Sequence, residues 1–181
     1  MQMNVAQLLK SPVGATRHYD MSQVMEIADG QSLVQGKIEL IRLGRSILAK
    51  AKLRTEVELT CSRCLTVFKH SLTLDIEEEY FPTINIITGV SMPVPDEPGA
   101  FTIDENNILD LSEAIRQYGL MALPMKPLCR EDCAGLCLTC GGNLNQTTCD
   151  CPPPVDHRMA VLRKLVLSNN QALASERKGN K

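Results

Sequence analysis

Eight cysteines constrain this 181-residue chain more than any other feature of its sequence. They form four close pairs, with one to three residues between the members of each: Cys61 and Cys64, Cys129 and Cys133, Cys137 and Cys140, Cys149 and Cys151. Thiolates at such spacings can converge on one tetrahedral metal ion, and a Zn2+ ion with four sulfur ligands needs two such pairs. The cysteines therefore suit two four-cysteine zinc sites with no ligand left over.

We expect one site to consist of the last four cysteines, Cys137, Cys140, Cys149 and Cys151. The stretch CLTCGGN resembles a zinc knuckle, in which Gly141 and Gly142 let backbone N–H groups turn toward sulfur. Eight residues then suffice for a small hairpin that returns the chain to the second pair. The other site would combine Cys61, Cys64, Cys129 and Cys133.

The second of these sites must close a long stretch of chain, because 64 residues separate Cys64 from Cys129. That closure costs about 4–5 kcal/mol of chain entropy, whereas a structural zinc site contributes about 10–16 kcal/mol. Metal binding can therefore offset the closure. Two alternatives stay open. One is a local site of Cys129, Cys133, Cys137 and Cys140 with a free Cys61–Cys64 dithiol; the other is an iron–sulfur cluster, which also takes four cysteines.

The stretch CSRC at residues 61–64 could also be a redox-active dithiol. A thioredoxin-type C-x-x-C begins a helix within a β-α-β context, whereas this one falls between two stretches that we predict to be antiparallel strands. Metal ligation is therefore favoured. Arg63 would lower the pKa of the neighbouring thiols and assist either chemistry, so it does not discriminate between them.

Between residues 32 and 80 the apolar residues alternate with polar ones. In residues 46–60 the apolar side chains share one parity and the charged ones take the other, which predicts a long strand with one buried face. Residues 32–43 and 65–80 also read as strands, with a tight turn at Gly44 and Arg45 and a second reversal at CSRC. Strands joined this closely should pair as an antiparallel meander.

Helical spacing predicts a short helix in residues 4–11 and a second one after a capping box of Asp110 and Glu113. A third helix should follow Asp156. The fold class is then α+β: an antiparallel meander covered by a few helices, with a cysteine-rich zinc-binding segment after it. We expect a core domain in residues 1–128 with a mobile acidic loop in 82–107, a zinc-binding segment in 129–154, and a C-terminal helix and polar tail in 155–181.

Charge is segregated along the chain although the net charge is only −2. Residues 37–54 contain six basic side chains and one acidic one, and residues 75–113 contain ten acidic and no basic ones. A basic strand face is often simply a solvated face. Its functional interpretation is a phosphate-contacting surface, with the candidate nucleic-acid-binding residues Arg42, Arg45, Lys50, Lys52 and Arg54.

No pattern in the sequence predicts an enzyme. The histidines His18, His70 and His157 fall in different predicted elements, and no phosphate-binding loop or nucleophile elbow occurs. With every cysteine assigned to structure, no open metal coordination position is implied. Because no secretory signal or long apolar segment is present, we expect a cytoplasmic protein with no membrane partner and no small-molecule substrate.

Four blocks resemble the bacterial YceD family of large ribosomal RNA subunit accumulation proteins. They are NVAQLLKSPVGATRHYD, ELTCSRCLTVF, ALPMKPLCREDCAGLCLTCGGNLNQTTCDC and DHRMAVLRKL. The resemblance implies a non-enzymatic factor that supports accumulation or processing of large-subunit ribosomal RNA during ribosome assembly. Its partners would be that RNA or a pre-ribosomal particle, and a basic ribosomal protein that faces the acidic stretch. The alternative from another class is a redox-responsive zinc adaptor that binds a protein partner.

Overall fold

A computed structural model describes residues 1–28, 30–95 and 99–152 of the chain. It divides into two compact units, one made of residues 1–62 and 66–129 and the other of residues 63–65 and the chain from residue 130 onward. The helix expected after Asp156 and the polar tail lie outside the described residues.

The first unit is built on one seven-stranded sheet with the order β1-β7-β6-β5-β4-β3-β2. Four long strands follow one another and pair antiparallel: β2 (Thr16–Ile27), β3 (Gly30–Arg42), β4 (Ile47–Thr60) and β5 (Val67–Pro82). Three short strands complete it: β1 (Gln2–Asn4), β6 (Phe101–Ile103) and β7 (Ile108–Asp110). The sheet is mixed, not wholly antiparallel as predicted, because β6 runs parallel to β5.

The alternation predicted for residues 46–60 is confirmed in β4. Ala49, Ala51 and Leu53 are at most 1% exposed, whereas Lys52 and Arg54 point to solvent. Successive side chains of a strand point to opposite faces, so one face of the curled sheet is the core face. The fully buried side chains include Leu40, Leu74, Ile76 and Ile103.

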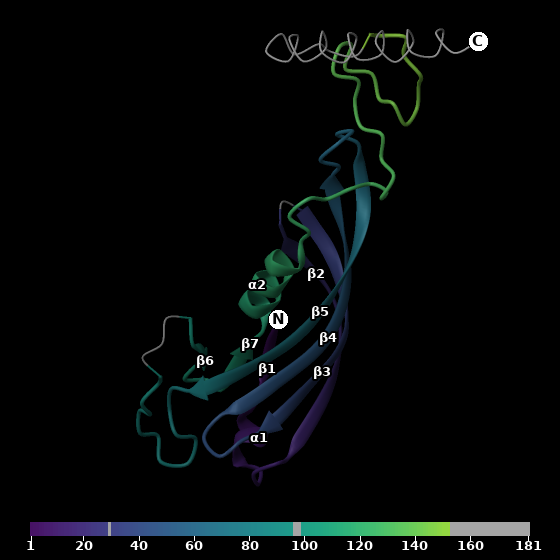
Figure 1. Ribbon diagram of the computed structural model, residues 1–181. Coiled ribbons are helices and arrows are strands. Elements are labelled where there is room, and N and C mark those ends of the chain that lie inside the picture. Colours follow the sequence, from purple (N-terminus) through teal and green to yellow (C-terminus); the bar gives the residue numbers. More distant parts are fainter. Residues whose placement is uncertain (29, 96–98, 153–181) are drawn as a thin grey trace, which may run out of the picture. The chain divides into compact units, whose positions relative to one another are not determined.

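Two helices accompany the sheet, α1 (Ala6–Lys10) and α2 (Ser112–Ala122). Figure 1 shows α2 against the inner side of the curled sheet, and it contacts β5 and β2. Gly119 permits this packing, since a Cβ built there would lie only 2.8 Å from the Ile27 side chain. The helix predicted within residues 4–11 is thus present as α1, and the helix predicted after Asp110 is present as α2.

The capping box predicted from Asp110 and Glu113 does not form. The residue that precedes α2 is Leu111, and no side chain caps the helix there. The Glu113 carboxylate instead accepts hydrogen bonds from Arg116 and Gln117 within the helix. These bonds lower the pKa of Glu113 to about 2, Arg116 being the larger cause.

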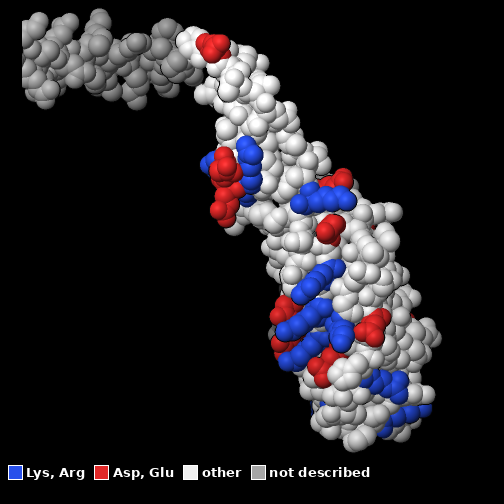
Figure 2. All heavy atoms as spheres, turned by 90° about the vertical axis from the view of Figure 1, so that its right-hand side faces the viewer, with Lys and Arg blue, Asp and Glu red and all other residues white. Residues whose placement is uncertain are grey.

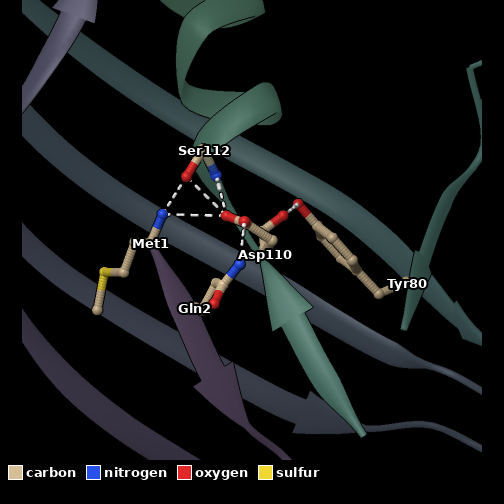
Figure 3. Close-up of polar contacts among 5 residues, drawn as sticks. All are labelled: Met1, Gln2, Tyr80, Asp110 and Ser112. Carbon is tan, nitrogen blue, oxygen red and sulfur yellow. Dashed lines mark hydrogen bonds and ion pairs between the residues drawn. The ribbon is translucent and has the colours of Figure 1, made fainter. Parts of the chain in front are cut away.

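Asp110 nevertheless organises the start of α2 (Figure 3). Its carboxylate accepts hydrogen bonds from the Ser112 hydroxyl (2.6 Å) and backbone N–H (2.9 Å), the Met1 amino group (3.0 Å) and the Gln2 amide (3.2 Å). Burial opposes ionisation, but these donors together hold the pKa of Asp110 well below its usual range. The Tyr80 hydroxyl donates to the Asp110 carbonyl (3.3 Å). β1, β5, β7 and α2 are therefore tied together at one residue.

Four strands were not predicted from the sequence pattern: the long β2 and the short β1, β6 and β7. β2 is one of the two edge strands of the sheet, and most of its side chains are exposed, so its sequence lacks clean alternation. β6 lies inside the stretch expected to be a loop of residues 82–107, and an isolated bridge joins Ile84 to Ser91 there. Pairing with β5, not local propensity, makes β6 a strand.

In the described part of the second unit the backbone forms turns, with one isolated bridge between Leu136 and Asn143. Backbone hydrogen bonds from Leu144 to the Gly135 carbonyl (2.9 Å) and from Cys137 to the Gly142 carbonyl (2.8 Å) continue this pairing. The result is a small hairpin around the Cys137–Cys140 knuckle, whereas the hairpin predicted in the eight residues between Cys140 and Cys149 is not among the paired segments of the described residues.

Candidate metal centres

The cysteine sulfurs gather in the two groups that their spacing predicts. Within each group the four Sγ atoms lie within 4.8 Å of one another. We call Cys61, Cys64, Cys129 and Cys133 the first cysteine group, and Cys137, Cys140, Cys149 and Cys151 the second cysteine group. The alternative partition, with residues 129–140 as one local site, does not occur.

Both groups have a geometry that fits a tetrahedral ion. Four sulfurs at about 2.3 Å from a central Zn2+ would lie about 3.8 Å apart, which is inside the 4.8 Å limit that both groups satisfy. Four thiols this close cannot all ionise without a cation, because each thiolate disfavours the next. A dication would remove that penalty. The donor set thus fits a thiophilic ion such as zinc, and four sulfurs also fit an iron–sulfur cluster.

Three of the four cysteines in the first cysteine group are buried, and Cys129 is half-buried. Cys61, Cys64 and Cys133 are 0%, 5% and 2% exposed. Cys61 follows directly on β4, where its N–H donates to the Thr66 carbonyl (3.0 Å) and closes the reversal into β5. Leu65 adopts a left-handed conformation (φ 57°) to complete that turn. CSRC therefore lies at a turn between antiparallel strands, as predicted.

Asn145 supports the first cysteine group and was not anticipated from the sequence. Its Nδ2 donates to the Cys133 Sγ (3.3 Å), and its Oδ1 accepts from the Ala134 N–H (2.8 Å) and from Arg130 (2.6 Å). The Asn145 Nδ2 also donates to the Asn143 Oδ1 (2.9 Å), which fixes the orientation of the Asn145 amide. Hydrogen bonds to a ligand sulfur favour the thiolate form that binds metal. The NLN run after the knuckle glycines was the available sequence signal.

In the second cysteine group the backbone of the knuckle turns toward sulfur. The N–H groups of Cys140 and Thr139 donate to the Cys137 Sγ and lower the pKa of that thiol to about 6. The turn also requires Gly141, whose φ of +72° is left-handed. The neighbouring Cys140 thiol, the largest cause, raises the pKa of Cys151 to about 12. Cys137, the cysteine of this group with the lowered pKa, is thus surrounded by thiols that a bound ion would have to deprotonate.

The five predicted nucleic-acid contacts do not form one surface. Arg42 is half-buried, and its guanidinium donates to the carbonyls of Leu9 (3.3 Å), Leu43 (2.5 Å) and Ser46 (3.0 Å). Burial lowers the pKa of Arg42. Arg45 lies in the turn between β3 and β4 beside Pro82. Arg42 therefore has a structural task.

Lys50, Lys52 and Arg54 do share the outer face of β4, and Lys37 on β3 joins them directly opposite Lys52. Figure 2 shows a band of Lys and Arg side chains on this face, with Asp and Glu side chains beside it. Lys50 pairs with Glu77 at 2.8 Å, and Lys52 approaches Asp75 at 4.0 Å. Residues Lys37, Lys52 and Arg54 line a hollow of about 970 Å3. Cross-strand register, which the sequence did not supply, brings Lys37 into this set.

Fold and site together define a mixed-sheet protein with two four-cysteine groups suited to metal. A family model described as large ribosomal RNA subunit accumulation protein YceD matches residues 49–166, about two thirds of the chain and both cysteine groups. The chain belongs to the YceD family. The family name indicates a role in accumulation of large-subunit ribosomal RNA.

Two plant proteins are similar to this chain. A chloroplastic YCED homolog 1 of Arabidopsis thaliana is 28% identical over 149 residues, which cover 71% of this chain and 46% of that protein. A chloroplastic YCED homolog 1 of Zea mays is 44% identical over 46 residues, covering 25% of this chain and 16% of that protein. The chain thus spans less than half the length of the curated relatives it matches. No solved structure matches it.

Within the described residues, no helix is both long and apolar enough to cross a membrane.

Proposed function

We propose that this protein is a non-enzymatic factor that holds two Zn2+ ions and supports accumulation of large-subunit ribosomal RNA in the cytoplasm. The observation that carries the proposal is the convergence of all eight cysteines into two groups of four sulfurs in a YceD-family chain. Four protein ligands close the coordination shell of zinc, so no position is left for a water or a substrate. The ions would hold the fold, not catalyse.

The basic outer face of β4 and β3 is the surface that we assign to RNA. Lys37, Lys52 and Arg54 stand together on it, and Lys and Arg are the side chains that neutralise phosphates. The acidic residues beside it would restrict binding to RNA of one shape and would repel other polyanions. The acidic residues in β5 and after it would face solvent or a basic ribosomal protein.

One experiment tests the metal and the RNA role together. Elemental analysis of protein purified under anaerobic conditions should give two zinc ions per chain and no iron. Cys64→Ser and Cys140→Ser should each remove about one ion, because each variant leaves three ligands in one group. In cells that depend on the variant, the Cys64→Ser change should lower the ratio of large- to small-subunit ribosomal RNA. A metal-free native protein that restores a normal ratio would exclude this function.

The RNA surface is tested by charge reversal. Replacing Lys37, Lys52 and Arg54 with Glu should weaken association with large-subunit precursors, and the slope of log affinity against log salt should fall by roughly 2–3, since each lost phosphate contact removes about 0.7–0.9. The matched control carries three Glu substitutions at exposed lysines outside this set, Lys10, Lys69 and Lys126. Equal effects of both triple variants would remove this surface from the proposal.

A second candidate, the redox-responsive adaptor, is favoured by one observation. The knuckle N–H groups lower the pKa of Cys137 to about 6, and its neighbour Cys140 is exposed; thiols in such surroundings oxidise readily. Burial of Cys61 and Cys64 argues against a redox-active dithiol at CSRC. Loss of one zinc ion under mild peroxide, with recovery under thiol reductant, would support the adaptor.

A further inference from the structure

The four long strands separate into two hairpins at one end of the sheet. The ladder between β3 and β4 ends at the pair Gln35 and Arg54. Beyond it β3 stays paired with β2 as far as Gly30, and β4 stays paired with β5 as far as Thr60. In Figure 1 the β4–β5 hairpin extends past the turn that joins β2 and β3. Residues 30–34 and 55–60 therefore form the two facing arms of a fork.

Within the described residues, the arms of the fork have backbone groups that lack a partner in the β3–β4 ladder, which ends at Gln35 and Arg54. Had the register continued, Val34 would lie opposite Thr55 and Gly30 opposite Leu59. Alternate residues of a strand direct their N–H and C=O groups to each side, so about half of those in residues 55–60 face the fork. Such an edge is a template for another strand.

A groove of about 880 Å3 occupies the fork, and both arms line it. Its apolar floor includes Ile27 and Val57, which are 1% and 3% exposed. Gly119 of α2 packs behind Ile27, so the floor is supported from the core side. A groove of this kind offers buried apolar contacts to alternate side chains of an incoming strand.

Thr55 gives an independent indication that the groove is incomplete. It is the first residue of β4 beyond the ladder, it lines the groove, and it is 4% exposed. Among the described residues, its hydroxyl is the one buried side-chain oxygen or nitrogen atom without a hydrogen-bond partner. A buried hydroxyl without a partner is costly. A strand entering the fork would bring backbone groups to this position.

The charge on the outer rim indicates the chemistry of the occupant. Glu56 and Glu58 point outward on the free edge of β4. Neither carboxylate forms an ion pair within the described parts of the chain. Arg54 stands at the closed end of the fork, and Lys69 lies on β5 opposite Glu58. A strand along the β4 edge would meet two unpaired carboxylates in succession on its outer side.

We propose that the fork binds an extended segment of another protein, in which small apolar residues alternate with Lys or Arg, as an added strand on residues 55–60 of β4. The apolar residues enter the groove over Ile27 and Val57. The basic residues lie on the outer side beside Glu56 and Glu58, where opposite charges in neighbouring strands attract. This surface meets the proposed RNA contact at Arg54, which lines both hollows, but its peptide contacts lie on residues 55–60 and do not depend on RNA binding.

The test uses the full zinc-loaded protein and a synthetic peptide, acetyl-Lys-Val-Lys-Val-Lys-Val-Lys-amide. Saturable binding is expected by fluorescence anisotropy, together with slower hydrogen exchange in residues 55–60. Two further peptides are N-methylated at every Val or at every Lys. At least one should lose about tenfold or more in affinity, because N-methylation removes the ladder donors on one edge.

Protein variants locate the site. Glu56→Gln combined with Glu58→Gln should weaken peptide binding about three- to tenfold. The matched control, Asp75→Asn combined with Glu77→Gln, removes two carboxylates from the same outer face away from the fork and should leave binding within twofold. All four side chains are exposed, so the variants should fold.

Several outcomes would overturn the proposal. The first is equal affinity for both N-methylated peptides and the parent peptide. The second is equal binding of a peptide with the same composition in which the Lys residues and the Val residues are grouped in two blocks. The third is no saturation up to millimolar peptide. Protection of residues 55–60 that rises with protein concentration alone would assign the fork to a second copy of the chain. Protection by single-stranded RNA in place of the peptide would assign it to nucleic acid.

Discussion

The two cysteine groups have the same ligands and different surroundings. Three of the four cysteines in the first group are buried, whereas in the second group none is buried and Cys140 is exposed. The first group joins residues far apart in the chain, from Cys64 to Cys129, and the second lies within 15 residues. A side-chain amide donates to sulfur in the first group, and backbone N–H groups do so in the second.

This difference separates a site that determines the fold from a site that determines a local turn. Closing a long loop removes more chain entropy from the unfolded state than closing a short one. Metal in the first group should therefore stabilise the sheet unit, and metal in the second group should mainly order its own hairpin. Exposed ligands also exchange metal more readily than buried ones.

The largest expected effect comes from removing one ligand of the first group. Cys61→Ser should lower the free energy of unfolding of the sheet unit by about 4 kcal/mol or more, because loss of a metal site is among the most destabilising changes. Tyrosine fluorescence measures this, since the chain lacks Trp and its tyrosines, Tyr19, Tyr80 and Tyr118, all lie in that unit. Cys140→Ser is the matched variant, with an expected change under about 1 kcal/mol. If the two variants unfold alike, the distinction between the groups is lost.

An intermediate effect is expected from the side-chain amide beside the first group. Asn145→Ala removes the hydrogen bond to the Cys133 sulfur and should weaken metal binding by about 10- to 100-fold, the usual effect of losing such a partner. Competition with a chromophoric zinc chelator measures the affinity. Thr147→Ala is the control, because it removes a hydrogen bond to the Asn143 carbonyl (3.3 Å) in the same segment and no bond to sulfur. Weakening confined to the second group would show that Asn145 serves the other site.

The smallest expected effect belongs to the turn of the second group. Gly141→Ala places a Cβ at φ +72°, where an L-residue costs roughly 1–2 kcal/mol. No atom lies within 4 Å of that Cβ, so conformational strain is the whole effect. Zinc should leave the second group sooner, and the thermal transition of the tyrosines should not move. Gly142→Ala, a position without positive φ, provides the comparison, and a larger loss there would contradict the role given to the turn.

Prediction from sequence succeeded where one local rule decided the outcome. Cysteine spacing anticipated both groups of sulfurs, since ligands one to three residues apart reach one point almost regardless of the fold. Strict alternation anticipated the buried face of β4. Prediction failed for β2, because an edge strand with solvent on most sides has no need of alternation.

The basic residues show the limit of reasoning from clusters in sequence. Arg42 lies in the same basic stretch as Lys52, yet its guanidinium is used to hold backbone carbonyls. Lys37, fifteen residues from Lys52 in sequence, lies directly opposite it across β3 and β4. Proximity in sequence gave no sign of either fact, because register is set by the packing of the buried side chains.

By itself, the sequence determined that the ligands are thiols, favoured their division into two groups of four and predicted the buried face of β4, since spacing and periodicity act over a few residues. The tertiary structure alone decided which thiols are buried, which lysines stand together, and where the ladder between β3 and β4 stops. Those features depend on twist, register and packing between elements distant in the chain, and no short stretch of residues contains that information.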